Sequence, residues 1–144
     1  VYTGKIQNWK EVGGYDAEIV KFTRNRNSGT RYYFKMNVLK GEAYCPGIIT
    51  CATNEQIVDS IMYNENGIGY AGFWNSMGVK TCAINGILPE DEYLTDDTYP
   101  LMRYLYFITI EKPGVEVRKF INWVLSAEGQ MEAQKIGYIP LIKK

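Results

Sequence analysis

A largely apolar run, an arginine-rich polar turn and a helical pattern follow one another near the start of this chain and most constrain its fold. Residues 17–22 predict a buried strand, and residues 32–40 predict a helix because Phe34 and Val38 lie four apart, on one helical face. The polar turn, residues 23–31, joins the two. A strand that leads through a turn into a helix is typical of an α/β fold.

The same segment predicts an anion site. Ser28, Gly29 and Thr30 fall at the expected N-terminus of the helix, where backbone N–H groups have no intrahelical partner and the helix dipole is positive. Gly29 lets the backbone approach a ligand closely, and the two hydroxyls add donors. This arrangement is typical of oxyanion binding at helix N-termini.

Three arginines, Arg24, Arg26 and Arg31, surround this point with positive charge. The simpler interpretation is that Ser28 only caps the helix and that the arginines are solvated. Because the chain has equal numbers of basic and acidic residues, the positive charge is local. A local concentration suits a small-anion pocket better than nucleic acid or an anionic membrane.

The rest of the chain alternates between strand and helix patterns, which predicts an α/β sandwich. Residues 1–14 predict the end of a helix and a turn, and residues 90–97 an acidic solvated loop or short helix. Helices are expected from an Asn54 cap, over 115–125, and from a Ser126 cap to Gly137; further strands are expected over 48–52, 68–72, 79–84 and 105–110.

Several chemistries are disfavoured by composition. The chain has no histidine, which excludes a Ser-His-Asp triad and any His-ligated metal. Cys45 and Cys51 flank a turn and could close a small disulfide loop. The alternative is that all three cysteines, Cys82 included, are buried thiols that act as small hydrophobic residues; their spacing does not indicate zinc. The twelve tyrosines are assigned to the core and an interlobe face rather than to a nucleic-acid groove. No cofactor and no metal are expected.

In order along the chain, several motifs resemble those of one family, the phosphate-binding proteins of bacterial ABC uptake systems. The segments that carry the resemblance are residues 1–14, Arg24 with Ser28-Gly29-Thr30-Arg31, Asn66 to Ala71, Tyr99 to Arg103, residues 120–130 and Gly137 to Leu141. The resemblance implies a type II periplasmic binding protein fold: an α/β three-layer sandwich lobe with a central mixed sheet flanked by helices. It also implies that residues 1–144 form one lobe and that the N-terminal lobe is absent from this chain.

The resemblance assigns ligand-binding roles to Arg24, Ser28, Gly29 and Thr30, with Arg26, Asn27 and Arg31 as further candidates. The family has an acidic residue shortly after the arginine, but here Asn25, Arg26 and Asn27 follow. Losing this carboxylate is expected to favour anion affinity over discrimination between phosphate and sulfate. The alternative is that Arg26 points into solvent. Arg31 is expected to matter less than Arg24, as a residue inside the helix that faces away.

The implied function is binding of phosphate, or a similar oxyanion, as the extracytoplasmic component of an ABC transporter, without enzymatic activity. The implied partners are the missing lobe and a membrane permease; the implied location is the periplasm or, as a lipoprotein, the cell surface. A sensory or regulatory domain of the same fold, or a binder of another oxyanion such as sulfate, remains an alternative. The isolated lobe is expected to self-associate through its exposed interlobe face.

Overall fold

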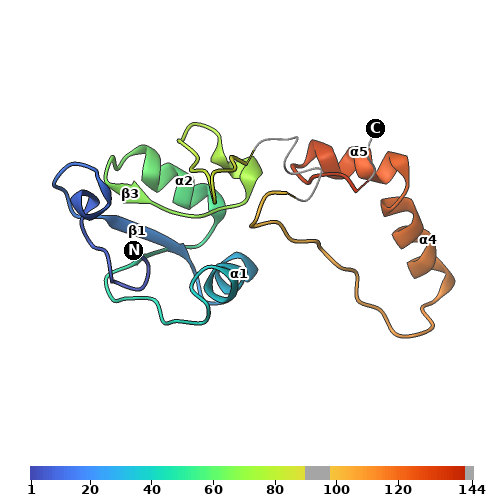
Figure 1. The fold of residues 1–144 in the computed structure, drawn as a ribbon. Helices are drawn as coiled ribbons and strands as arrows, with labels where there is room; N and C mark the ends of the chain where they lie inside the picture. Colours follow the sequence, from blue (N-terminus) through green and yellow to red (C-terminus); the bar gives the residue numbers. More distant parts are fainter. Residues whose placement is uncertain (90–97, 142–144) are drawn as a thin grey trace. The chain divides into compact units, whose positions relative to one another are not determined.

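The computed structural model describes residues 1–89 and 98–141 and divides the chain into two compact units, Val1–Lys80 and Thr81–Lys144 (Figure 1). The expectation of a single lobe over residues 1–144 stays a prediction. The acidic segment at residues 90–97 lies outside the described residues.

A three-stranded parallel sheet forms the centre of the first unit. Strand β1 (Val20–Arg24) lies between β2 (Ile49–Cys51) and β3 (Gly67–Ile68), and both pairings are parallel. We expected a mixed sheet, but among the described strands no antiparallel pair is present. The physical reason is that a helix connects each strand to the next and returns the chain to the end of the sheet where the previous strand began. The next strand therefore runs in the same direction.

Helices cover the two faces of this sheet, which confirms the α/β class. Helix α1 (Gly29–Asn37) connects β1 to β2, and α2 (Asn54–Met62) connects β2 to β3; Figure 1 shows them on opposite sides of β1. Because successive strand residues point to opposite faces, Val20 and Phe22 face α2. There Phe22, Cys51 and Ile57 form a buried cluster, with Val20 and Ile61 packed against it.

The opposite face of the sheet carries an aromatic cluster, defined by Tyr2, Phe34, Tyr44 and Tyr70. The rings of Phe34 and Tyr70 stack with centroids 3.9 Å apart, and Tyr2 meets both edge-on. The Tyr2 hydroxyl lies 3.1 Å from the carbonyl oxygens of Phe22 and Ile68, in β1 and β3. Tyr2 therefore lies in the core, as predicted, whereas Tyr44 and Tyr70 are half-buried.

Several predicted elements differ in detail. The first residues form a short 3-10 helix, Trp9–Val12, capped by Asn8, rather than the end of a longer helix. Helix α2 is capped by Thr53, whose Oγ1 accepts from Gln56 N at 3.2 Å, and not by Asn54. The predicted strand at 68–72 shortens to the pair Gly67–Ile68. The predicted turn at Asn85-Gly86 is present, with both residues at positive φ, but the strand expected before it reduces to one bridge between Ile84 and Ile87.

The described part of the second unit contains two helices, α4 (Val115–Val124) and α5 (Ala127–Lys135). Ser126 caps α5, as predicted, by accepting from Gly129 N at 3.3 Å. The prediction of a strand over residues 105–110 is wrong, because this segment forms neither a strand nor a helix in the structure. A segment rich in strand-forming residues becomes a strand only when a neighbouring strand accepts and donates its backbone hydrogen bonds. No described strand pairs with residues 105–110.

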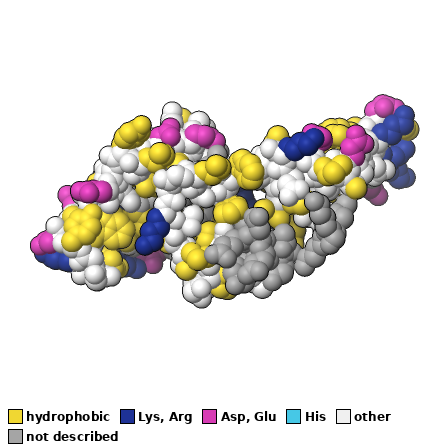
Figure 2. All heavy atoms as spheres, turned by 90° about the horizontal axis from the view of Figure 1, so that it is seen from above, with side chains coloured by type: hydrophobic (Ala, Val, Ile, Leu, Met, Phe, Trp, Pro, Cys, Tyr) yellow, Lys and Arg dark blue, Asp and Glu magenta, His cyan; other side chains and the backbone are white. Residues whose placement is uncertain are grey.

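Hydrophobic side chains remain exposed in this second unit, whereas the buried hydrophobic residues of the described chain all belong to the first. Ile108 is 95% exposed and Phe120, on α4, is 55% exposed. Figure 2 shows hydrophobic side chains (yellow) scattered over the surface that faces the viewer. None of the helices in the described ranges has the length and apolar character needed to cross a membrane.

Candidate anion-binding turn

The candidate site lies at the carboxyl edge of the parallel sheet, where β1 ends at Arg24 and β2 at Cys51. The predicted strand–turn–helix unit is present, although α1 begins at Gly29 rather than Tyr32 and ends at Asn37 rather than Lys40. In open α/β sheets this edge is where ligands bind. We call residues 25–30 the anion turn.

Backbone donors are available in the anion turn. Ser28 is the N-cap of α1: its Oγ accepts from Arg31 N at 3.3 Å, and its own N–H donates to Asn25 O at 3.1 Å. Within the described part of the chain, the N–H groups of Gly29 and Thr30 make no hydrogen bond. Since these groups also lie at the positive end of the helix dipole, they are suited to an anion.

Arg24 is fixed by neutral groups from the neighbouring strand end. Its Nη1 donates to Asn54 Oδ1 at 2.5 Å and its Nη2 to the Ala52 carbonyl at 2.9 Å. Its Nε is buried and has no hydrogen-bond partner among the described residues. Because neither partner is a carboxylate, the charge of Arg24 is oriented without being neutralised.

Arg31 does not face away from the sheet, contrary to expectation. Its Nη1 donates to the Arg24 carbonyl at 2.9 Å and to Thr23 Oγ1 at 3.2 Å. Its guanidinium carbon lies 4.1 Å from the centroid of the Tyr44 ring, a cation–π contact. A long side chain in the first turn of a helix points back toward the N-terminus, which brings Arg31 to the end of β1.

Arg26 and Asn27 are exposed on the turn. Arg26 lines an open cavity of about 400 Å³ together with Arg31, Tyr32, Lys35, Ala43 and Tyr44. Three of these six residues are basic, so Arg26 adds to the positive charge on this side of α1.

A row of hydrogen-bonded hydroxyl groups links the end of β1 to the first turn of α1. Thr23 Oγ1 is hydrogen-bonded to the Tyr70 hydroxyl, which lies 2.7 Å from that of Tyr44. The Tyr44 hydroxyl in turn donates to the Arg31 carbonyl at 3.2 Å. Burial raises the pKa of Tyr70 well above its ordinary value, so the Tyr70 hydroxyl stays protonated well above neutral pH.

Sequence reasoning missed Asn54, Ala52, Tyr44 and Tyr70 as supports of the site. Ala52 and Asn54 follow directly on β2, the neighbour of β1, so the rule that parallel strands end at one edge would have drawn attention to them. No local pattern singled out the two tyrosines.

The three cysteines are free thiols, which resolves the alternative left open for Cys45 and Cys51. Cys51 is buried in the core behind β2, and Cys82 is exposed. Across residues 1–89 and 98–141, no group of His, Cys, Asp or Glu side chains is arranged to hold a metal ion.

Comparison with known families matches residues 1–128 to the PBP superfamily domain. The chain is similar to the phosphate-binding protein PstS of Pseudomonas aeruginosa, with 37% identity over 96% of this chain and 48% of the relative. It is also similar to PstS of Bacillus subtilis, with 32% identity over 98% of this chain and 48% of the relative. The chain therefore spans about half the length of these curated relatives.

Among solved structures, the chain is similar to a putative phosphate ABC transporter substrate-binding protein from Clostridium perfringens with bound phosphate. The TM-score is 0.76 and the sequence identity 31%, over 99% of this chain and 59% of that one.

Proposed function

The chain belongs to the PBP superfamily, and we propose that it forms one lobe of an oxyanion-binding protein that takes phosphate for an ABC transporter. The similarity to PstS proteins supports this ligand. In the proposed protein, the anion turn supplies one side of the site and a second lobe, absent from this chain, supplies the other.

The observation that carries the proposal is the meeting of unmatched donors at one edge of the sheet. The N–H groups of Gly29 and Thr30 lack acceptors among the described residues, and Arg24 stands beside them with its fork already oriented. The buried Nε of Arg24 also lacks a partner among the described residues. An unmatched buried donor costs about 1–3 kcal/mol, and charge-assisted hydrogen bonds to an anion are among the stronger ones. Ser28 and Thr30 add hydroxyl donors.

The absence of a carboxylate at this turn supports a site with high general affinity for oxyanions. The described hydrogen-bond partners of Arg24 and Arg31 include no Asp or Glu side chain. A carboxylate would repel a fully deprotonated ligand and would accept a hydrogen bond from the O–H of a protonated one. Without such a group on this lobe, discrimination between phosphate and sulfate depends on the second lobe.

The same arrangement supports binding rather than catalysis. The chain has no histidine, and no carboxylate contacts the arginines of the turn within the described residues. General acid–base catalysis needs a group of that kind within hydrogen-bond reach of the ligand. We therefore assign the protein a receptor role. The similarity to PstS proteins and to an ABC transporter substrate-binding protein supports a location outside the cytoplasm, with a membrane permease as the recipient of the ligand.

The exposed hydrophobic surface of the second unit supports a missing partner lobe. In a stable protein, side chains such as Ile108 and Phe120 are normally covered, and contiguous exposed apolar surface marks an interaction site. The lobe that the chain lacks relative to its PstS relatives is the natural cover.

Calorimetric titration of the full two-lobed protein with phosphate and with sulfate tests the proposal. Arg24→Ala should weaken phosphate binding by about 2–3 kcal/mol, roughly 30- to 150-fold. Arg31→Ala is the matched control, because the described contacts of Arg31 are internal and its loss should mainly lower stability. No saturable binding of either anion would reject the proposed function, and equal affinity losses in both variants would reject the assigned roles of the two arginines.

A further inference from the structure

A second polar cavity lies in the first unit, away from the anion turn. It has a volume of about 580 Å³ and is lined by residues from the first loop, β1 and the segment before β2: Thr3, Gly4, Gln7, Glu18, Ile19, Val20, Lys21, Cys45, Pro46 and Gly47. This volume falls in the range of small-molecule sites.

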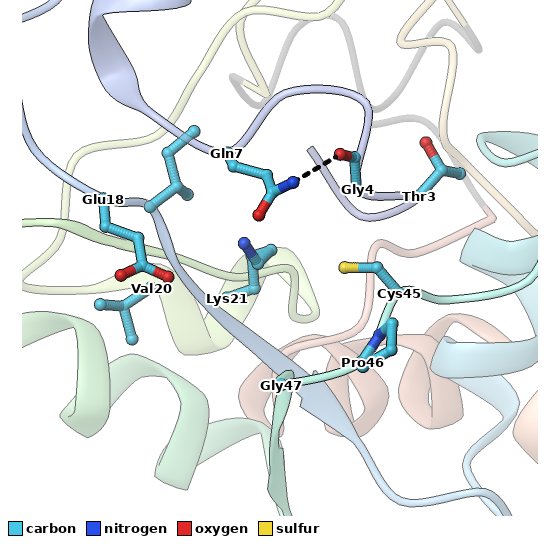
Figure 3. Close-up of a pocket in the computed structure, with 10 residues that line it drawn as sticks. Thr3, Gly4, Gln7, Glu18, Val20, Lys21, Cys45, Pro46 and Gly47 are labelled. Carbon is cyan, nitrogen blue, oxygen red and sulfur yellow. Dashed lines mark hydrogen bonds between the residues drawn. The ribbon is translucent and has the colours of Figure 1, made fainter.

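Lys21 is the unusual member of this lining. The residue is only 6% exposed, and its side chain makes no hydrogen bond or ion pair within the described ranges. In Figure 3 the side chain of Lys21 lies near the middle of the labelled residues. Gln7 and Gly4 lie above it, Glu18 to its left and Cys45 to its right. The buried side-chain atoms of the described residues that lack a hydrogen-bond partner do not include Lys21 Nζ, so the stem of the side chain is buried while the ammonium opens into the cavity.

The position of Lys21 on β1 explains why it cannot reach the anion turn. Arg24 is the last residue of β1, at the carboxyl edge, whereas Lys21 lies near the start of the strand. Lys21 and Thr23 share a face of the sheet, opposite the face of Phe22. The cavity lining contains none of the residues assigned to phosphate.

We propose that this cavity binds a small organic monocarboxylate, whose anionic end pairs with Lys21. The charges of the lining favour a monoanion over a phosphate dianion, because Lys21 is its single basic residue and Glu18 adds a negative charge. Gln7, which lies beside Lys21 in Figure 3, and Thr3 offer hydrogen-bonding groups, and Ile19 and Pro46 offer apolar contacts for a short aliphatic tail. Binding gives the Lys21 ammonium an anionic partner inside the cavity and leaves the anion turn free.

Calorimetry and thermal shift measurements on the full-length protein test this assignment, with acetate, propionate and butyrate as probes. Propionamide serves as the neutral analogue, and sodium chloride matches the ionic strength. Saturable binding of carboxylates is expected, and Lys21→Met should weaken it about ten- to hundredfold while phosphate affinity stays unchanged. Lys5→Met, which removes an exposed lysine paired with Glu42, is the matched control and should retain carboxylate binding.

Equal effects of propionate, propionamide and chloride would overturn the proposal, as would unchanged carboxylate affinity in Lys21→Met. No carboxylate binding at all would also overturn it, and would indicate that another part of the full-length protein supplies the counterion.

If Lys21→Met does not fold, the variant Gln7→Leu provides the test instead. Gln7 is exposed and makes one described side-chain hydrogen bond, to the Gly4 carbonyl. Its replacement should still weaken carboxylate binding severalfold, and unchanged affinity would reject the site.

Discussion

At the residue scale, Asn54 determines how Arg24 is presented. The amide oxygen of Asn54 accepts from Nη1 at 2.5 Å, and the Ala52 carbonyl holds Nη2. A carboxylate in the place of this amide would orient the guanidinium equally well but would also neutralise it. A substitution of Asn54 by Asp would therefore keep the orientation of Arg24 while neutralising its charge.

Asn54→Asp should lower phosphate affinity by about 1–2 kcal/mol, roughly five- to thirtyfold, because the new carboxylate repels the anion and pairs with Arg24. Asn54 is the first residue of α2, where an acidic side chain is compatible with the helix dipole, so folding should be preserved. Calorimetric titration measures the change. Asn54→Ala removes the contact without adding charge and should lose less; a larger loss in Asn54→Ala would show that orientation matters more than charge.

The buried hydroxyls of Tyr2 and Tyr70 make stability sensitive to high pH. Burial raises the pKa of both phenols above the ordinary value of 10.0. A group whose folded pKa exceeds its unfolded pKa contributes stability that is fully present below the unfolded value and is lost as pH rises above it.

The free energy of unfolding should therefore decline above about pH 10, as the unfolded tyrosines ionise and the folded ones do not. Urea unfolding between about pH 8 and 11.5 measures the decline. Tyr2→Phe, which has no phenol proton to lose at this position, should show a shallower decline. Identical pH profiles for the two proteins would contradict this explanation.

At the scale of elements, the turn between α4 and α5 leaves no room for a side chain at Gly129. A Cβ at this position would collide with the Trp123 carbonyl and would lie 2.6 Å from Val124 Cα and 2.7 Å from Val124 O. The obstacles are backbone atoms, which cannot move aside as a flexible side chain can. The glycine is thus required by the close approach of the two helices.

Gly129→Ala should destabilise the protein by about 1–3 kcal/mol through this overlap. Gly114→Ala is the matched control, since Gly114 precedes α4 with φ −59° and a Cβ there meets no heavy atom within 4 Å. Chemical denaturation of both variants, followed by circular dichroism, gives the comparison. Equal stabilities would mean that the α4–α5 turn relaxes freely.

At the scale of the whole molecule, a two-lobed site places donors on both sides of the anion and excludes water. In the proposed two-lobed protein, residues 1–144 contribute one of these two sides. The loss of half the hydrogen bonds forfeits several kcal/mol, so a micromolar site, worth about −8 kcal/mol, should weaken to millimolar or beyond in the isolated chain.

The isolated 144-residue chain should also self-associate, because its second unit exposes large hydrophobic side chains. Titration with phosphate at low salt, sizing chromatography and a circular dichroism check of folding test both expectations. Micromolar phosphate binding by a folded monomer of this chain would show that one lobe holds a complete site.

Local physics allowed the sequence by itself to predict the strand–turn–helix unit, the Ser126 cap and the Asn85-Gly86 turn. Each depends on neighbours in the chain: helical spacing of apolar residues, a side-chain oxygen that accepts from an early N–H, or residues that tolerate positive φ. The α/β class followed from the order of these elements.

Tertiary structure alone decided which groups meet at the sheet. The pairing of β1 with β2 brings Ala52 and Asn54 to Arg24. The Arg31 side chain, which points back toward the N-terminus of α1, reaches Thr23. It also decided that residues 105–110, although rich in strand-forming residues, pair with no described strand, and that Lys21 is buried. These outcomes depend on contacts between residues far apart in the chain, and no local pattern encodes them.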